Sequence, residues 1–426
     1  MLQISRIRTD KQNIATALKK RGWDDNKSAV LDKVIALDDD RKSIQSANDE
    51  LLSQRNILSK EIGNLFKSGK GTEANEAKSK VETLKTTISE NEAKISTIKD
   101  NIEEFLLSIP NVPNELVPNG LTEEDNLITK DWTESLPELP EGALPHWELG
   151  KKYDILDFEL GVKLTGAGFP VFRKKGSRLQ RALINFFLDE ANKQGYEEIV
   201  PPLLVNEDSA KGTGQLPDKE GQMYHVTKDG LYLIPTAEVP ITNLYRNDIV
   251  KEAELPIKLT GYTPCFRREA GSYGSDVKGL NRVHQFDKIE VVQIVHPDKS
   301  YETLDQMVSY VETLLTKLEL PYRILRLCGG DLTYASALTY DFEVYSAAQK
   351  KWLEVSSVSN FETFQSNRLK LRYKNAEGKN QLAHTLNGSA LALARIIAAL
   401  LENNQTDEGI KIPEALRKYT GFDILN

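Results

Sequence analysis

Cysteine is scarce in this chain, and long apolar runs are missing from it. Cys265 and Cys328 are the only cysteines among 426 residues and belong to no CxxC pair or Cys/His cluster, so neither a disulfide framework nor a zinc site is expected. The longest apolar run, residues 390–401, is interrupted by Arg395 and is too short to span a bilayer. The first residues, MLQISRIRTDKQ, lack the apolar stretch of a signal peptide. We therefore expect a cytoplasmic protein without membrane contact.

An excess of positive charge is also absent. The net charge is −8 at pH 7, so no global positive field would attract nucleic acid, and any RNA contact must rely on local basic patches. The composition is otherwise that of an ordinary soluble protein, with 39% hydrophobic and 28% charged residues. The length allows two or three domains and a large core.

Two runs of residues recur at heptad spacing in the N-terminal quarter. The first seam comprises Val30, Val34, Leu37, Arg41, Ile44, Asn48, Leu51, Arg55, Leu58, Ile62 and Leu65, and the second comprises Val81, Leu84, Ile88, Asn91, Ile95, Ile98, Ile102, Phe105 and Ile109. A polar turn, KSGKGTEANE, separates them. This pattern predicts an antiparallel coiled-coil hairpin over about residues 30–109. Helices of about 36 residues would give an arm roughly 54 Å long.

The exposed face of this arm has two interpretations. Heptads most often mediate dimerisation, whereas the short turn favours pairing within one chain. Residues 1–110 hold 19 basic and 18 acidic side chains, against 36 and 45 in the rest of the chain, and the basic residues near the tip are Lys60, Lys67, Lys70, Lys78, Lys80 and Lys85. Such an arm suits contact with a phosphate backbone, but lysine-rich faces are commonly only solubilising.

The chain after the arm changes character twice. Six of the 17 prolines lie in residues 110–145, which predicts an extended connection. A mixed α and β body follows. Its predicted strands are 222–226, 231–234, 259–266, 282–295, 341–345 and 352–358, with helices at 178–193, 299–318 and 385–403.

The segment 264–290, PCFRREAGSYGSDVKGLNRVHQFDKIE, carries the strongest chemical signal. It is predicted to form two strands around a loop that contains Gly271, Gly274 and Gly279, which would let the backbone fold over a ligand. Arginine forks match phosphate oxygens bidentately, and the segment supplies Arg267, Arg268 and Arg282 beside Glu269 and Phe286. These groups are what a nucleoside polyphosphate requires. Taken singly, such arginine and glutamate residues usually form a solvated salt-bridge face, and such a phenylalanine is usually core.

The complete string resembles motif 2 of the class II aminoacyl-tRNA synthetases, and within them the seryl-tRNA synthetases. The helix at 178–193 followed by a strand up to residue 205 resembles motif 1, which forms the dimer interface of that family, and residues 385–403 resemble motif 3. The sequence departs from the family pattern at Arg268, where many relatives carry a small residue, and at Ala390 and Ala394, where glycine is common. Alanine at those two positions is expected to stiffen the start of a motif 3 helix.

The resemblance implies an α+β fold, with an N-terminal antiparallel α-helical coiled-coil arm followed by a catalytic domain built on an antiparallel β-sheet flanked by helices. The implied boundaries are a tRNA-binding helical domain over residues 1–110, a proline-rich connection over 111–160 and a class II catalytic domain over 161–426.

The resemblance also implies an ATP site. Arg267 is expected to be catalytic and to bridge the amino-acid carboxylate and the α-phosphate, while Glu269 lies near the adenine amino group and Phe286 stacks on the base. Arg282 or the loop would reach the outer phosphates, and Arg395 the γ-phosphate. The complete expected ATP set is Arg267, Arg268, Glu269, Arg282, Val283, Phe286, Glu354, Val355, Ser356, Ser357 and Arg395.

A magnesium ion is expected at one end of the ATP. Glu354 and Ser357 place a carboxylate and a hydroxyl near each other at a strand end, and Mg²⁺ prefers oxygen ligands. Serine-rich strand ends are usually hydrogen-bonding turns, so this assignment depends on the resemblance of residues 354–357 to the family's E-[IV]-S-S string.

A serine pocket is implied by three further segments. IPTAEVP resembles the family's TAE loop, and the expected serine-binding residues are Thr236, Ala237, Glu238, Arg267, Glu290, Asn387 and Ser389. Carboxylates and hydroxyls suit a small polar side chain and disfavour alanine, which would leave them unpaired. Which glutamate binds the amino group and which the hydroxyl is left open. GTGQLP, residues 212–217, resembles a mobile loop beside the site.

The resemblance implies the activity of a seryl-tRNA synthetase, a ligase of the zinc-independent form. It would form seryl-adenylate from L-serine and ATP with Mg²⁺ and transfer serine to the 3′ end of tRNA(Ser), with tRNA(Sec) as a further candidate. The expected partners are tRNA, held by the arm and the catalytic domain, and a second copy of the chain in a homodimer. Two alternatives are a related enzyme that charges a carrier protein and a non-enzymatic coiled-coil dimer. The intact hairpin disfavours the first, and the retained Arg267, Glu269, Glu354 and Arg395 disfavour the second.

Overall fold

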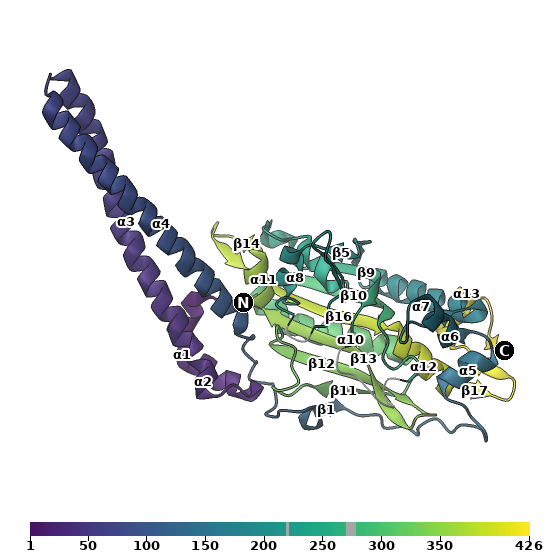
Figure 1. Ribbon diagram of the computed structural model, residues 1–426. Coiled ribbons are helices and arrows are strands. Elements are labelled where there is room, and N and C mark those ends of the chain that lie inside the picture. The colour runs from purple at the N-terminus through teal and green to yellow at the C-terminus, as the bar shows by residue number, and fades with distance from the viewer. Residues whose placement is uncertain (219–220, 270–277) are drawn as a thin grey trace. The chain divides into compact units, whose positions relative to one another are not determined.

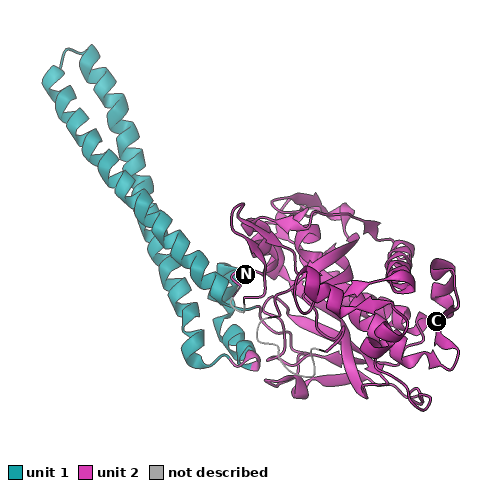
Figure 2. Cartoon of the chain, turned by 45° about the vertical axis from the view of Figure 1, so that its right-hand side comes forward, with its two compact units in different colours: residues 1–19, 23–110 teal, residues 20–22, 111–426 magenta. Residues whose placement is uncertain are grey.

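The computed structural model describes residues 1–218, 221–269 and 278–426. The chain divides into two compact units (Figure 2). Unit 1 comprises residues 1–19 and 23–110, and unit 2 comprises residues 20–22 and 111–426.

Unit 1 is a long helical hairpin with a short helical base (Figure 1). Helices α3 (Val30–Lys67) and α4 (Gly71–Ser108) have 38 residues each, so each is roughly 57 Å long. The base is formed by α1 (Ile4–Leu18) and α2 (Asp25–Ser28). The predicted antiparallel hairpin is confirmed.

The predicted heptad seam lies inside this hairpin. Val34, Ile88 and Ile95 are buried, and the intervening seam positions are at least half-buried. Lys33 lies over the ring of Phe105 at 5.8 Å, near the base of the hairpin. Pairing of an early α3 residue with a late α4 residue fixes the antiparallel register.

A buried carboxylate joins α1 to α3. Asp38 is 3% exposed and lies 2.9 Å from Arg8, 2.7 Å from Arg41 and 2.8 Å from Lys42. Burial raises the pKa of Asp38, but hydrogen bonds from the three cations outweigh burial and hold it well below its usual range. The negative charge of Asp38 is therefore compensated by three cations at the point where α1 packs against α3.

Unit 2 is built on an eight-stranded sheet whose neighbours run side by side in Figure 1. Every pairing is antiparallel except that of β4 with β9. In spatial order the strands are β1 (Leu127–Lys130), β11 (Tyr322–Arg326), β12 (Leu338–Ser346), β13 (Lys351–Glu362), β16 (His384–Ala392), β10 (Gln285–Val295), β9 (Ile257–Phe266) and β4 (Glu197–Glu198).

The longest helices that pack on this sheet are α7 (Lys174–Lys193), α10 (Ser300–Lys317) and α12 (Leu393–Asn403). Each is amphipathic or apolar and contributes to one large core, for example through Leu183 and Phe187 of α7. Ile289 and Val291 of β10 belong to the same core, because alternate residues of a strand face the same side. Among the described residues, no helix combines the length and the apolarity that crossing a membrane would need.

Shorter elements surround the main sheet. The helices are α5 (His146–Lys152), α6 (Phe158–Leu164), α8 (Glu207–Thr213), α9 (Glu238–Asn243), α11 (Thr363–Leu369) and α13 (Glu414–Thr420). The strands are β2 (Leu156–Asp157), β3 (Val171–Phe172), β5 (Leu204–Val205), β6 (His225–Val226), β7 (Leu231–Leu233), β8 (Ile249–Lys251), β14 (Arg372–Lys374), β15 (Asn380–Leu382), β17 (Gln405–Thr406), β18 (Gly409–Lys411) and β19 (Ile424–Leu425).

The predicted helix over residues 385–403 is wrong in its first half. Residues 384–392 form β16, which pairs with both β10 and β13, and the helix begins only at Leu393. Small residues suit this central position, since a Cβ on Gly388 would already lie 3.1 Å from Val358. Ala390 is therefore a buried strand residue, and the expected stiffening of a helix start does not apply to it.

The proline-rich connection holds a strand that its composition did not indicate. Residues 127–130 form β1 and extend the main sheet beyond β11. All four residues of β1 are exposed, which explains why the strand has no apolar alternation. Its partner strand is distant in sequence, so tertiary pairing decides its structure.

Replacing Asn48 with leucine should stabilise the hairpin. Asn48 is 2% exposed, and its Oδ1 atom accepts no hydrogen bond from any described residue. Removing this buried oxygen should contribute about 1–2 kcal/mol. Amide hydrogens in the adjoining turns of the full-length protein should then exchange about tenfold more slowly.

Leucine at the exposed Ser53 of the same helix is the matched control and should leave those exchange rates nearly unchanged. Faster exchange in Asn48→Leu would mean that the amide stabilises the seam, contrary to this prediction.

Candidate active site

A cavity of about 690 Å³ opens in unit 2 beside the central strands. Its lining comes mainly from β10, β13 and β16, from the start of α12, and from the segments 213–218, 222–223, 235–238, 267–269, 280–283 and 327–335. Fifteen of the 17 residues predicted from the sequence line it, and Arg268 and Ala237 do not. Segments separated by more than 150 residues in sequence are therefore brought together.

Arg267 lies at the centre of the predicted set. Its Nε donates to the carbonyl oxygen of Pro235 at 3.3 Å, and its guanidinium carbon lies 5.3 Å from the centre of the Phe286 ring. Arg267 directly follows β9, and the pairing of β9 with β10 brings it close to Phe286. The guanidinium thus lies between the segment of Thr236 and Glu238 on one side and an aromatic face on the other.

Glu269 and Arg282 form an ion pair across the two sides of the hairpin, with 3.4 Å between Glu269 Oε2 and Arg282 Nη1. Glu269 has a φ of 48°, a conformation uncommon for a residue with a side chain. The predicted loop glycines Gly271 and Gly274 lie outside the described residues. Gly279, which is described, has a φ of 69°.

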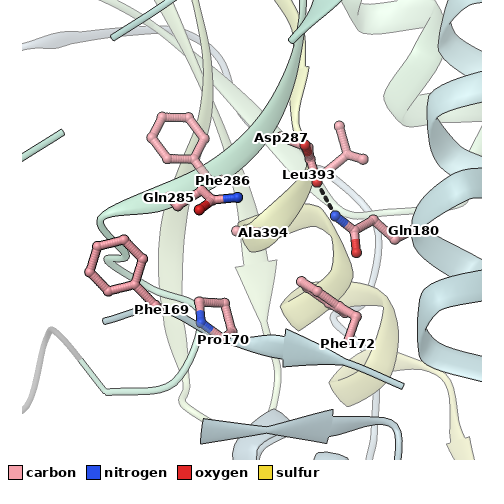
Figure 3. A pocket seen from close by; sticks show the side chains of 9 residues that line it. All are labelled: Phe169, Pro170, Phe172, Gln180, Gln285, Phe286, Asp287, Leu393 and Ala394. Atoms are coloured by element: carbon pink, nitrogen blue, oxygen red, sulfur yellow. Dashed lines mark hydrogen bonds between the residues drawn. The ribbon is translucent and has the colours of Figure 1, made fainter. Parts of the chain in front are cut away.

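A small cavity of about 100 Å³ shares Phe286 with the main one (Figure 3). In this cavity Gln180 of α7 donates a hydrogen bond to Asp287, which also accepts one from Tyr262 at 2.8 Å. Burial raises the pKa of Asp287. These bonds tie the strand that carries Phe286 to α7.

A second cluster lies around Glu354 and Arg395. Arg395 donates to the carbonyl oxygen of Glu354 at 2.6 Å and to that of Asn281 at 2.8 Å, and its guanidinium lies 3.5 Å from the Glu354 carboxylate. Ser357 donates to Glu354 at 3.5 Å. The expected phosphate-binding and metal-binding residues therefore lie together at one end of the cavity.

Asp341 joins this cluster from β12, where it pairs with Ser357. Burial and the nearby Glu354 hold the pKa of Asp341 well above its usual range. Its Oδ1 atom is buried without a hydrogen-bond partner among the described residues. Two carboxylates and a hydroxyl at this end form an oxygen donor set of the kind that Mg²⁺ prefers.

A separate group of buried charges also lines the cavity. Glu290 accepts from Thr236 Oγ1 at 2.9 Å and pairs with Lys288 at 2.8 Å, and all three residues are nearly inaccessible. Glu238 accepts from Gln365 Nε2 at 2.6 Å. Burial, followed by the negative charge of Glu290, raises the pKa of Glu238 to about 7. Two carboxylates thus share one buried ammonium group.

The sequence did not predict Lys288, Asp341 or Gln365 as residues of this site. Lys288 stands two positions before Glu290, so the period of a strand could have identified it as a neighbour on the same face. Asp341 and Gln365 gave no comparable signal, because only the pairing of β12 with β13 and the placement of α11 bring them here. The GTGQLP segment does line the cavity through Thr213, Gly214, Gln215 and Pro217, while its closure remains a prediction.

Among the described residues, no three or more histidine, cysteine, aspartate and glutamate side chains gather as a metal-binding group. Both cysteines are buried and free of disulfides. The oxygen set at Asp341 is thus mixed, with a hydroxyl as one member.

Comparison with protein-family models gives two matches along the chain. A model described as "Seryl-tRNA synthetase N-terminal domain" matches residues 1–113. A model described as "tRNA synthetase class II core domain (G, H, P, S and T)" matches residues 224–404.

Full-length relatives and solved structures agree with these matches. Proteins named serine–tRNA ligase from Salinibacter ruber and Nautilia profundicola are 47% and 48% identical, over 99% and 98% of this chain and 98% and 100% of theirs. A crystal structure of seryl-tRNA synthetase from Pyrococcus horikoshii complexed with ATP has a TM-score of 0.91 at 33% identity, covering 100% of this chain and 99% of that one. The cytoplasmic enzyme of Naegleria fowleri in complex with AMP has a TM-score of 0.86 at 29% identity and the same coverage.

Glutamine in place of Glu238 should stabilise the ligand-free protein above neutral pH. A raised pKa means that the folded protein holds this proton more tightly than the unfolded chain, so the free energy of unfolding falls as pH rises from the ordinary value of 4.5 to about 7. At pH 8 the variant should be more stable by on the order of 2 kcal/mol, and at pH 4.5 the difference should vanish. Thermal unfolding at both pH values measures this.

Glu190→Gln supplies a control of opposite sign. Burial raises the pKa of Glu190, but hydrogen bonds from Lys193 and Lys317 lower it overall, so this variant should lose stability at pH 8. A Glu238→Gln protein that is less stable than the wild type at pH 8 would contradict the prediction.

Proposed function

The chain belongs to the seryl-tRNA synthetase family, and we propose that the cavity of about 690 Å³ binds L-serine and ATP side by side. A seryl-tRNA synthetase is a ligase that activates L-serine with ATP to seryl-adenylate, releases pyrophosphate, and transfers serine to the 3′ end of tRNA. The observation that carries the proposal is the position of Arg267, which contacts both the Pro235 carbonyl, next to Thr236, and the ring of Phe286.

In the first step a serine carboxylate oxygen attacks the α-phosphorus and pyrophosphate leaves. Arg267 holds the carboxylate and the α-phosphate together and stabilises the charge that develops on the phosphoryl oxygens. Phe286 stacks on the adenine, with Glu269 near the adenine amino group. Arg282 and Arg395 bind the outer phosphates, for which a planar guanidinium is well suited.

Magnesium would be held at the Arg395 end of the cavity. Glu354 and Ser357 are the predicted ligands, and we add Asp341, whose buried and unpartnered Oδ1 fits a cation with oxygen ligands. The ion would neutralise phosphate charge when bound. The proposal includes no zinc ion for binding the amino acid.

The serine pocket is proposed at Thr236, Glu238 and Glu290, with Asn387 and Ser389 from β16. Two buried carboxylates against the single ammonium group of Lys288 leave one negative charge uncompensated. The ammonium group of serine would complete the balance, and its hydroxyl would satisfy the remaining acceptors. Alanine would leave those acceptors unpaired, which disfavours its binding.

The helical hairpin is proposed to bind tRNA by shape and backbone contacts, as the lysine-bearing tip predicts. On this proposal residues 1–110 are the tRNA-binding domain, residues 111–160 the connection, and residues 161–426 the catalytic domain. The protein would act in the cytoplasm.

A homodimer is proposed through the segment that resembles motif 1. Val200 is 88% exposed and Leu204 is 41% exposed, next to the two-residue edge strand β4. Exposed apolar side chains beside an unpaired strand edge favour burial against a second copy.

Replacing Arg267 with lysine should abolish most serine activation. Lysine keeps the charge but loses the planar fork, so serine-dependent exchange between ATP and pyrophosphate should fall at least about 100-fold. The wild-type protein should exchange with serine and not with alanine or threonine. Arg372→Lys on β14, which does not line the cavity, is the matched control. Normal exchange by Arg267→Lys, or exchange by the wild type with another amino acid in place of serine, would refute the proposal.

Deleting residues 35–100 should separate the two steps. The contact of Lys33 with Phe105 shows that the ends of this deletion lie on adjoining turns, so a short linker can close the gap. Serine-dependent exchange should stay within about threefold of the wild type, while transfer of serine to tRNA falls at least about 100-fold because one of two binding regions is lost. Unchanged charging of tRNA would exclude a role for the arm.

A further inference from the structure

A buried hydrogen-bond network lies outside the cavity, around His146 at the start of α5. His146 and Glu402, near the end of α12, are both fully buried. The ring nitrogen Nδ1 of His146 lies 2.7 Å from Glu402 Oε1, and the backbone N–H of His146 donates to the same oxygen at 3.0 Å. Neither residue takes part in the chemistry described above.

The second ring nitrogen points to the segment that leads into β10. The backbone N–H of Leu280 donates to His146 Nε2 at 2.8 Å. Because Nε2 must accept this bond, the ring proton is on Nδ1 and is donated to Glu402. Burial raises the pKa of Glu402, but its hydrogen bonds from His146 and Ser346 outweigh burial and lower it overall. Glu402 therefore fixes the tautomer that Leu280 requires.

Gly279 lies directly against the same ring. A Cβ atom at this position would be 2.2 Å from His146 Nε2, and the φ of Gly279 is 69°. A side chain there would displace either the imidazole or the backbone. The contact is independent of the hydrogen bond to Leu280 and shows that the imidazole and this backbone fit closely.

Asn281 connects this network to the proposed ATP site. Its carbonyl oxygen accepts from Arg395 Nε at 2.8 Å, and its side-chain amide donates to Gln349 at 2.7 Å. Gln349 in turn donates to Glu402 at 3.0 Å. Arg282 and Val283, which line the cavity, follow directly in sequence.

We propose that His146, with its tautomer set by Glu402, is a positioning residue for ATP binding. It fixes the backbone of residues 279–281 and through Asn281 the guanidinium of Arg395. This inference rests on the proposed function for the identity of the ligand. Small displacements of binding groups can reduce a rate about 100-fold. Because the network contacts Arg395 of the proposed ATP site, loss of the imidazole should weaken ATP binding and leave serine binding unchanged.

Two substitutions separate the two bonds of the ring. Asn in place of His146 can keep the donor at the δ position toward Glu402 but cannot reach Leu280. Gln can place an acceptor near the ε position, where Leu280 N–H needs it. Each variant loses one hydrogen bond of the same buried network, so the two should lower thermal stability by similar amounts.

The experiment measures serine-dependent ATP–pyrophosphate exchange with the full-length protein. In His146→Asn the KM for ATP should rise about tenfold while the KM for serine stays within about twofold, and His146→Gln should remain within about threefold of the wild type for both. Gly279→Ala should reproduce the ATP defect of His146→Asn. Glu190→Gln, a buried carboxylate of α7 paired with Lys193 and Lys317, controls for general destabilisation and should leave both KM values unchanged.

Several results would overturn the inference. The first is an equal rise of the KM for ATP in His146→Asn and His146→Gln. The second is a rise of the KM for ATP in Glu190→Gln as large as that in His146→Asn. The third is a KM for serine in His146→Asn that rises together with the KM for ATP. Normal ATP kinetics in His146→Asn would also overturn it, while leaving the proposed function intact. A wild-type protein without serine-dependent exchange would instead refute the proposed function, and this inference with it.

Discussion

The alternation of residues along β10 is the constraint on which the rest of the structure depends. Ile289 and Val291 point into the core, whereas Lys288 and Glu290, which alternate with them along the strand, line the cavity. The strand therefore stabilises the sheet and supplies the charged end of the site at once. A shift of register by one residue would bury the charges in the core and expose the apolar side chains to the ligand.

Local strings of sequence were sufficient to predict many of the residues that line the cavity. Arg267, Phe286 and Glu290 belong to one hairpin, so their neighbourhood follows from strand pairing over a short distance. The heptads of the arm were equally informative, because burial at every third and fourth residue is set by helix geometry alone. Both predictions depend on interactions close in sequence.

Predictions failed where distant pairing decides the outcome. Residues 384–392 are apolar and small, a composition that periodicity cannot assign to a helix or a strand, and their place between β10 and β13 determines the result. Asp341 reaches the site only through the register of β12 with β13, and Gln365 only through α11. The four exposed residues of β1 are a strand solely because β11 offers an edge.

Arg395 and Glu402 stand seven residues apart on α12, the same spacing that defines the seam of the coiled-coil arm. Two helical turns separate them by roughly 10.5 Å and keep both on one side of the helix. The helix thus acts as a rigid spacer with a guanidinium at one end and a buried carboxylate at the other. One inserted residue between them would rotate the two groups by roughly 100° relative to each other, so the length of this stretch is constrained even where its individual side chains could vary.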